Sequence, residues 1–375
     1  MKRLRRFLVI VSAALLAVGV VMVYSASAIH SQETMGSRGY YLIRHLSSLG
    51  IGLILAVALL GCDMQWIRRH LKVMVGCCIL LLVLVLLPGI GHEVSGARRW
   101  FRLGFLSFQP SEAAQLVVIL YMADVLARKQ DRLRSFVHGF LPPMLVLGTF
   151  LGLILLEPDL GTAFVMAVVT FMMLFVSGIK PIHLGPALAS GLPILALLIL
   201  AKPYRVRRIV AFADPWADPL GSGFQLIQSL VAVGAGGLFG VGLGQSAQKL
   251  YYLPAGHTDF IYSLIGEELG LMGTTVVLVL FVLFVVVGLR MAYRSHDLFA
   301  QLAGVGITAW VGLKAMVHMA VTTGLIPTKG LPLPFVSYGG SSLIFSLLGV
   351  ALLLNLSREI PVQEPKAMMV PGRTG

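Results

Sequence analysis

The chain has 375 residues, of which 57% are hydrophobic and 12% are charged, and its formal net charge is +13. Soluble domains carry about a quarter of their residues as charged groups, so this composition excludes a large soluble domain. Many apolar runs of about 18–20 residues predict an all-α, polytopic integral membrane protein. In such a chain, membrane topology and anionic lipid headgroups explain the excess of Lys and Arg, and we expect no nucleic-acid partner.

The apolar runs predict about ten transmembrane helices. We expect them at residues 7–27, 42–62, 73–90, 111–127, 137–156, 162–179, 184–201, 269–289, 301–323 and 341–356. Ten crossings place both termini on one side, and most Lys and Arg residues fall on that side, so both termini are predicted to be cytoplasmic. The large loop between the seventh and eighth helices is then extracytoplasmic. We expect one transmembrane domain over 1–360 and a short disordered cytoplasmic tail over 361–375.

A polar segment, QSAQKLYYLPAGHTDFIYSLIGEELG (245–270), interrupts this apolar chain. It contains His257 and Asp259 in the HTDF stretch, followed by Glu267 and Glu268. A carboxylate at the boundary of lipid and water is costly to maintain, which favours a functional role. His257 and Asp259 alone are a weak zinc signal, so we predict no metal site, although a divalent cation shared with a substrate phosphate stays open.

Other predicted outer segments combine cations with isolated carboxylates. In GARRWFRLGFLSFQPSE (96–112), Arg98 and Arg99 can bind phosphate oxygens, and Glu112 either stabilises the start of the next helix or is a buried partner of an arginine. In EPDLGTA (157–163), Asp159 either caps a helix or lies near Asp259. This mixture predicts an anionic substrate and acid–base chemistry, with salt bridges among loops as the alternative.

The remaining outer segments contain turns and glycines. Residues 225–233 predict a short amphipathic helix, and DPWADP before it is typical of a turn. The glycine run GAGGLFGVGLG matches no nucleotide-binding pattern and favours close packing of an interfacial segment. The stretch IPTKGLPLPFVSYGGSS (326–342) contributes Lys329 and Ser337 beside a helix start that could bind an anion, with a structural plug as the alternative.

Taken together, these motifs resemble the SEDS family (shape, elongation, division and sporulation), the polytopic peptidoglycan glycosyltransferases of bacteria. The matching stretches, in order, are GARRWFRLGFLSFQPSE, EPDLGTA, YRVRRIVAFADPWADPLGSGFQLIQSL, YYLPAGHTDFIYSLIGEELG and PTKGLPLPFVSYGGSS, which span about residues 96–342. YLPAGHTDFI, GEELG and TKGLPLPF resemble the division-type (FtsW-like) branch more than the elongation-type (RodA-like) branch. Ala255 departs from the pattern, because relatives often have Glu there.

The resemblance implies a substrate and a set of site residues. The substrate would be lipid II, a disaccharide-peptide on undecaprenyl diphosphate, and Asp259 would be the catalytic carboxylate. Diphosphate or sugar binding is implied for Arg98, Arg99, Arg205, Lys249 and Lys329. We add Glu112, His257 and Ser337 as substrate-binding residues, and Asp159, Glu267 and Glu268 as supporting residues. No cofactor is required, although Mg²⁺ or Mn²⁺ could take part.

The resemblance also implies a cellular setting and leaves rival functions to test. It places the chain in the bacterial cytoplasmic (inner) membrane at the division septum, beside a class B penicillin-binding protein transpeptidase, other division proteins and membrane lipids. A lipid II flippase is the rival from another class, and a scaffold without chemistry is a third interpretation. Burial would raise the pKa of Asp259 and nearby arginines would lower it, and the sequence does not decide between these effects.

Overall fold

The computed structural model describes residues 1–358 apart from 95, 105, 134, 250–252 and 254–255; Ala255 and the predicted tail over 361–375 therefore lie outside the described residues. Each predicted membrane span has a counterpart. These are α1 (Lys2–Met35), α2 (Tyr40–Gly61), α3 (Met64–Leu86), α4 (Pro110–Arg128), α5 (Leu141–Leu156), α6 (Leu160–Val176), α7 (Pro181–Leu200), α10 (Ile261–Tyr293), α11 (Leu298–Thr322) and α12 (Gly340–Leu356).

The length and composition of these helices make the chain a multi-pass membrane protein. In the described part of the chain, eight helices are long and apolar enough to cross a membrane. The other two matched helices, α6 and α12, have 17 residues each. Asp63, Asp159 and Asp297 begin α3, α6 and α11, where each carboxylate accepts a hydrogen bond from a backbone N–H of the first turn.

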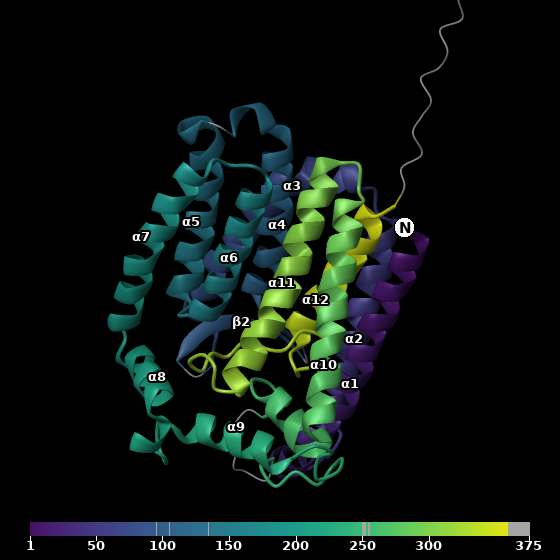
Figure 1. The fold of residues 1–375 in the computed structure, drawn as a ribbon, viewed down its shortest axis with the longest axis vertical. Coiled ribbons are helices and arrows are strands. Elements are labelled where there is room, and N and C mark those ends of the chain that lie inside the picture. The colour runs from purple at the N-terminus through teal and green to yellow at the C-terminus, as the bar shows by residue number, and fades with distance from the viewer. Residues whose placement is uncertain (95, 105, 134, 250–252, 254–255, 359–375) are drawn as a thin grey trace, which may run out of the picture.

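The start of α1 and the end of α12 lie at the same end of the bundle (Figure 1). The opposite end, which we call the outer end, carries two further helices from the long loop, α8 (Pro203–Ala213) and α9 (Phe224–Ala235). This arrangement agrees with an even number of crossings. The predicted amphipathic helix over 225–233 is confirmed as α9, and the predicted turn before it contains a 3₁₀ helix, η3 (Pro215–Ala217).

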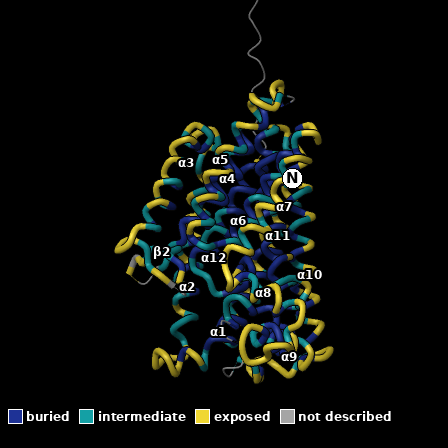
Figure 2. Tube along the Cα trace, turned by 90° about the vertical axis from the view of Figure 1, so that its left-hand side faces the viewer, coloured by how far each residue is buried: buried dark blue, intermediate teal, exposed yellow. Residues whose placement is uncertain are grey.

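Helices α4 and α11 form the centre of the bundle. In their most apolar windows, 78% of α4 and 72% of α11 are buried, against 6% of α7. Figure 2 shows the buried positions concentrated in the middle of the bundle, and in Figure 1 α7 stands at its edge. Polar groups on α4 or α11 are therefore enclosed by protein and need partners inside the bundle.

A break at Gly270 divides α10, which begins at Ile261 rather than at the predicted residue 269. Gly270 has φ 66°, and a Cβ there would lie 2.4 Å from the backbone nitrogen of Gly240. The glycine-rich segment fills the break, because the backbone N–H of Val241 donates to the carbonyl of Glu267 at 2.9 Å. The glycines thus allow two backbones to approach closely, as the sequence favoured.

The segment between α3 and α4 was interpreted as a loop and instead contains a three-stranded antiparallel sheet. Its strands are β1 (His92–Val94), β2 (Ala97–Leu103) and β3 (Leu106–Phe108), in the order β1-β2-β3. Gly96 and Gly104 lie between the strands with φ 77° and 61°, a backbone region that glycine adopts without strain. The sheet places the arginines of β2 on a defined backbone at the outer end.

Candidate active site

Asp259 lies in the turn that leads into α10, and the segment 326–342 holds this turn in place. The Ser337 hydroxyl donates to the carbonyl of Thr258 at 2.6 Å, and the backbone N–H of Tyr338 donates to the carbonyl of His257 at 3.0 Å. Ser337 also accepts from the backbone N–H of Leu333 at 2.9 Å. The Ser337 hydroxyl is thus engaged beside Asp259 in this structure, and its predicted contact with substrate stays a prediction.

Burial outweighs the neighbouring arginines in setting the proton affinity of Asp259. Its pKa rises from the ordinary 3.8 to about 6, chiefly because the carboxylate is removed from water. The positive charges of Arg208 and Arg99 lower this pKa, while the negative charge of Asp159 raises it. The carboxylate therefore lies within the electrostatic reach of β2, of α8 and of the turn before α6.

Arg99, on β2, holds the turn between α5 and α6. Its Nε donates to the carbonyl of Glu157 at 2.7 Å, and its Nη2 donates to the carbonyl of Pro158 at 2.8 Å. Asp159 follows in the same turn, where it accepts from the backbone N–H of Thr162 at 3.0 Å and so caps α6. Asp159 also acts on the Asp259 carboxylate, so both predicted interpretations of Asp159 apply together.

Glu157 is a buried acid that the sequence reasoning did not single out. Its side chain is fully buried, and neither carboxyl oxygen has a hydrogen-bond partner among the described residues. Burial, with the nearby charge of Asp159, raises the pKa of Glu157 to about 9, although Arg99 opposes this rise. Glu157 is therefore protonated at neutral pH, unlike Asp259.

Gly330 lies beside Asp259, and Lys329 directly precedes it in the chain. The Lys329 ammonium lies 4.5 Å from the centre of the Phe164 ring, a cation–π contact, and burial lowers the pKa of Lys329. A Cβ at Gly330 would lie 3.0 Å from Oδ2 of Asp259. The predicted lysine is therefore the chain neighbour of a glycine that lies close to the carboxylate, and substrate binding by Lys329 stays a prediction.

Replacement of Gly330 by Ala is expected to lower kcat by about tenfold or more, because the added methyl pushes the carboxylate from its position and small misplacements of catalytic groups are costly. Steady-state rates with lipid II, the substrate that the resemblance implies, would show this loss without a change in the melting temperature. Gly148→Ala is a matched control, since a Cβ at Gly148 meets nothing within 4 Å. Equal rates for Gly330→Ala and the wild type would contradict the expectation.

His257 is packed among aromatic rings rather than beside a metal site. Its ring centre lies 5.0 Å from that of Tyr41, 5.7 Å from that of Tyr338 and 6.0 Å from that of His30. Burial, helped by His30, lowers the pKa of His257 to about 4, so the imidazole is neutral at physiological pH. The stack fixes the backbone two residues before Asp259, and substrate contact by His257 stays a prediction.

Three further predicted cations are engaged with other protein groups. Arg98 pairs with Glu93 at 3.2 Å on the exposed sheet. Arg205 is buried and donates to the carbonyl of Leu198 at 2.6 Å, which fastens α8 to the end of α7. The Lys249 ammonium donates to Glu268 at 2.9 Å in a buried ion pair. Their predicted role in substrate binding would require these contacts to open.

Glu267 and Glu268 support the segment that leads to Asp259. Glu267 accepts from the Ser246 hydroxyl and from the backbone N–H of Ala247, the latter at 2.8 Å. Glu268 accepts from the Ser25 hydroxyl at 2.7 Å in addition to its pair with Lys249. Both carboxylates thus tie the start of the polar segment to α10 and α1, and their supporting role at the site stays a prediction.

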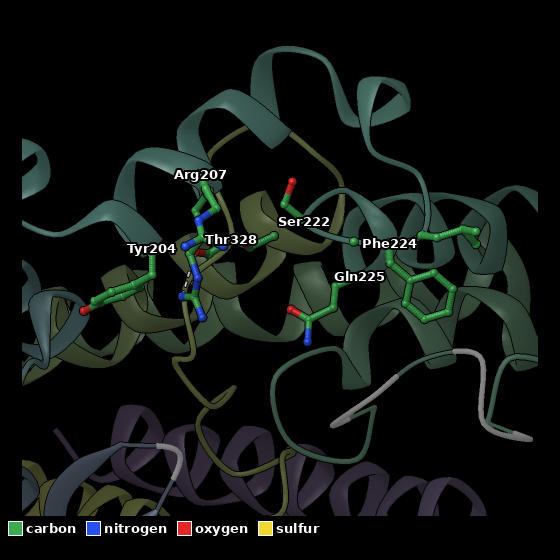
Figure 3. Close-up of a pocket in the computed structure, with 9 residues that line it drawn as sticks. Tyr204, Arg207, Ser222, Phe224, Gln225 and Thr328 are labelled. Carbon is green, nitrogen blue, oxygen red and sulfur yellow. Dashed lines mark hydrogen bonds between the residues drawn. The ribbon is translucent and has the colours of Figure 1, made fainter.

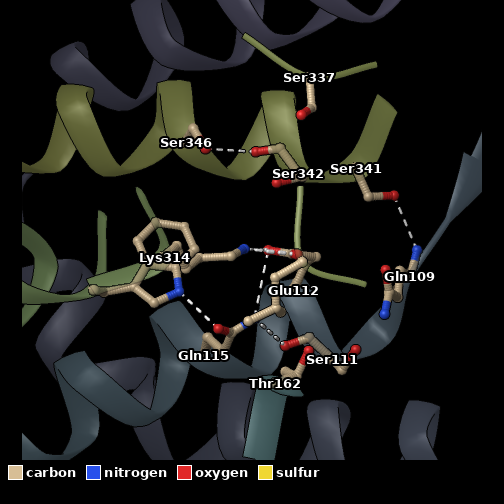
Figure 4. A network of polar contacts seen from close by, with 12 residues as sticks. Gln109, Ser111, Glu112, Gln115, Thr162, Lys314, Ser337, Ser341, Ser342 and Ser346 are labelled. Atoms are coloured by element: carbon tan, nitrogen blue, oxygen red, sulfur yellow. Dashed lines mark hydrogen bonds and ion pairs between the residues drawn. The ribbon is translucent and has the colours of Figure 1, made fainter. Parts of the chain in front are cut away.

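Glu112 is buried in the bundle and pairs with a lysine, so the predicted partnership with an arginine is wrong. The Lys314 Nζ donates to Oε1 and Oε2 of Glu112 at 2.7 and 2.8 Å (Figure 4). Gln115 lies beside the pair and accepts from the indole N–H of Trp310 at 2.7 Å. The network joins α4 to α11. Each charge stays paired with its partner on the other helix, because an unpaired charge at the protein centre is costly. Substrate binding by Glu112 stays a prediction.

Arg208 is the cation that the sequence reasoning left unassigned. It lies on α8, and its Nη1 donates to the carbonyl of Thr328 at 3.2 Å. Among the charged groups that change the pKa of Asp259, Arg208 has the largest effect. The start of the long loop contains four cations, Lys202, Arg205, Arg207 and Arg208. Only the folded helix shows that Arg208 has the strongest effect on the carboxylate.

The chain matches known proteins over nearly its whole length. A family model described as "Cell cycle protein", covering FtsW, RodA and SpoVE, matches residues 5–361. A probable peptidoglycan glycosyltransferase FtsW of Trichlorobacter lovleyi is 45% identical over 350 residues, 93% of this chain and 92% of that protein. The stage V sporulation protein E of Bacillus subtilis is 44% identical over 351 residues, 94% of this chain and 96% of that protein.

The fold has a solved counterpart. A structure described as "Structural coordination of polymerization and crosslinking by a peptidoglycan synthase complex" matches with a TM-score of 0.76 and 35% identity, over 93% of this chain and 96% of that one. The sequence motifs, the architecture of the bundle and the similar proteins all indicate the same family. The chain therefore belongs to the cell cycle protein family of FtsW, RodA and SpoVE, the SEDS family that its motifs resemble.

Proposed function

We propose that the chain is a peptidoglycan glycosyltransferase that polymerises lipid II on the outer face of the bacterial cytoplasmic membrane. One observation carries the proposal: the partly buried Asp259 carboxylate, whose pKa rises to about 6, lies within electrostatic reach of cations from two separate elements, Arg99 and Arg208. The FtsW relative, named a probable peptidoglycan glycosyltransferase, supports the reaction and the septal setting.

Asp259 acts as the general base in this mechanism. In its ionised form it removes the proton from the acceptor sugar hydroxyl, whose oxygen attacks the anomeric carbon of the donor. The bond between that carbon and the diphosphate oxygen breaks, its electron pair leaves with the diphosphate, and the configuration at the carbon inverts. The diphosphate is a good leaving group, so the cations only need to stabilise its growing charge.

The raised pKa suits this role. A pKa of about 6 leaves most Asp259 side chains ionised at neutral pH, and the same shift makes the carboxylate a stronger base than an exposed aspartate. Asp159 contributes by raising the pKa, while Arg99 and Arg208 keep it from rising further. The opposing charges thus place the base near its working pH.

The rate is expected to fall on acidification with a midpoint near pH 6 rather than near 3.8, because protonated Asp259 cannot accept a proton. Because burial raises the pKa of Asp259, the acid limb of kcat/KM moves to higher pH. Arg208→Gln should move the limb further upward, since the Arg208 charge lowers this pKa. A pH profile of polymerisation for both proteins checks this, and an unmoved limb in the variant would count against it.

A divalent cation and protein partners extend the proposal. Among the described residues, no group of three or more His, Cys, Asp or Glu side chains is arranged to hold a metal ion, so Mg²⁺ or Mn²⁺ would need substrate oxygens among its ligands.

A class B penicillin-binding protein transpeptidase at the septum is the proposed partner. The solved structural neighbour, described as a peptidoglycan synthase complex, supports this choice.

Purified protein in liposomes with labelled lipid II tests the function directly, with and without the candidate transpeptidase. We expect glycan polymers on a gel. Lipid II that crosses the bilayer while no polymer forms would instead establish the flippase. In this structure the Glu112–Lys314 pair is buried and mutually neutralised, so neither side chain is exposed to water.

A further inference from the structure

A cavity of about 390 Å³ opens between α8, the turn before α9 and the segment after α11 (Figure 3). Its polar lining consists of Tyr204, Arg207, Arg208, Ser222, Gln225 and Thr328. Figure 3 shows Arg207 of α8 and Gln225 of α9 extending into the same space. The site residues predicted from the sequence are all absent from this lining.

The lining is positively charged and rich in hydrogen-bond donors. Arg207 and Arg208 supply two guanidinium groups, and none of the described residues that line the cavity has a carboxylate. The nearby Asp218 is occupied within its own turn, where it accepts from the backbone N–H and the hydroxyl of Ser222 at 2.7 and 3.0 Å. In the described part of the chain, Arg207 has no ion-pair or hydrogen-bond partner. The cavity therefore favours an anion with several acceptor oxygens.

The cavity adjoins the catalytic carboxylate. Arg208 donates to the carbonyl of Thr328 at 3.2 Å, and Thr328 lies two residues before Gly330, where an added Cβ would lie 3.0 Å from Oδ2 of Asp259. The charge of Arg208 also acts on Asp259. Arg208 thus links the two, because it lines the cavity and its charge lowers the pKa of Asp259.

We propose that this cavity binds the leaving diphosphate of the donor lipid, a deepening that rests on the glycosyltransferase function proposed above. The donor diphosphate is bonded to the reacting carbon, so it must lie near the base. In a linear polymer the acceptor hydroxyl belongs to the sugar without the diphosphate, so the acceptor's own diphosphate lies beyond both of its sugars. Proximity to Asp259 therefore selects the donor.

Size and polarity agree with this ligand. Small-molecule sites span about 300–1,000 Å³, so a cavity of about 390 Å³ takes a diphosphate with adjacent groups but not a whole disaccharide-peptide. Leu220 and Phe224 form the apolar part of the lining and suit the first isoprenoid carbons after the diphosphate. When the bond between the sugar carbon and the diphosphate oxygen breaks, Arg207 and Arg208 neutralise the charge that moves to that oxygen.

Binding of farnesyl diphosphate to full-length protein in detergent tests the assignment without turnover, in an Asp259→Asn background. We expect Arg207→Gln/Arg208→Gln to raise the Kd about tenfold or more, since charge-assisted hydrogen bonds to the diphosphate are lost. Arg102→Gln is the matched control: Arg102 is an exposed arginine at the outer end that does not line the cavity. An unchanged melting temperature checks that the variants fold.

The results separate this assignment from the function on which it rests. An unchanged Kd in the double variant overturns the cavity assignment, as does equal competition by phosphatidylglycerol, which would make the cavity a general headgroup site. Competition by farnesyl diphosphate but not by a disaccharide-peptide without diphosphate supports it. Wild-type protein that binds farnesyl diphosphate but makes no polymer refutes the proposed function and leaves the anion site standing.

Discussion

Replacement of Asp259 by Asn is expected to reduce polymerisation of lipid II by about 10²- to 10⁴-fold, the range that a general base contributes. Asn keeps the size of the side chain but cannot accept the proton of the acceptor hydroxyl. The loss should appear in kcat, with little change in KM, because the base acts in the transition state rather than in substrate binding. Single-turnover polymerisation, followed on a gel, measures it.

A matched control removes another carboxylate from the outer end. Glu33, in the last turn of α1, is exposed and has no hydrogen bond or ion pair with the described site residues, so Glu33→Gln should polymerise lipid II at the wild-type rate. Asp259→Asn protein must retain its melting temperature and its affinity for farnesyl diphosphate. Polymer at the wild-type rate from this folded variant would remove Asp259 as the base and leave its raised pKa without a catalytic purpose.

The helices were predictable because the bilayer sets their length. An apolar run such as 301–323 has few other solutions in lipid, and α11 confirms it within three residues at each end. The sheet was not predictable in the same way. Strands β1 and β3 have only three residues each, and the cations and aromatic residues of β2 are equally typical of an interfacial loop.

Some site residues could likewise be predicted from local sequence, whereas others depend on the fold. Asp259 stands out because an isolated carboxylate in an apolar chain is costly, and Asp159 because a helix begins after it. Arg208 could not be distinguished from Arg205 in the sequence, since only the turn of α8 directs one arginine to Asp259 and the other to Leu198. Ion pairs across long separations, such as that of Lys249 with Glu268, depend on the fold and leave no local pattern.

The buried pair Glu112–Lys314 leads to the second large effect. Lys314→Met is expected to lower the free energy of unfolding by about 3–5 kcal/mol, because it leaves the Glu112 carboxylate buried without its cation. The double variant Glu112→Leu/Lys314→Met should recover much of this loss, since both charges are then absent. Thermal unfolding in detergent of the wild type, both single variants and the double variant measures the coupling.

An exposed pair gives the matched comparison. Arg98 and Glu93 are 40% and 53% exposed at their side chains, so Arg98→Met should change the free energy of unfolding by about 1 kcal/mol or less. A double variant of the buried pair as unstable as the sum of its single changes would contradict the assigned coupling of α4 with α11.

The same double variant decides the role of Glu112. If Glu112 only fixes α4 against α11, polymerisation per folded molecule should stay near the wild-type rate once both charges are removed. If Glu112 also reaches the substrate, as the sequence predicted, the KM for lipid II should rise in the double variant although its stability has returned. Stability and KM therefore separate two functions of one carboxylate: a buried ion pair holds helices together through its partner, whereas a substrate contact is lost with the charge itself.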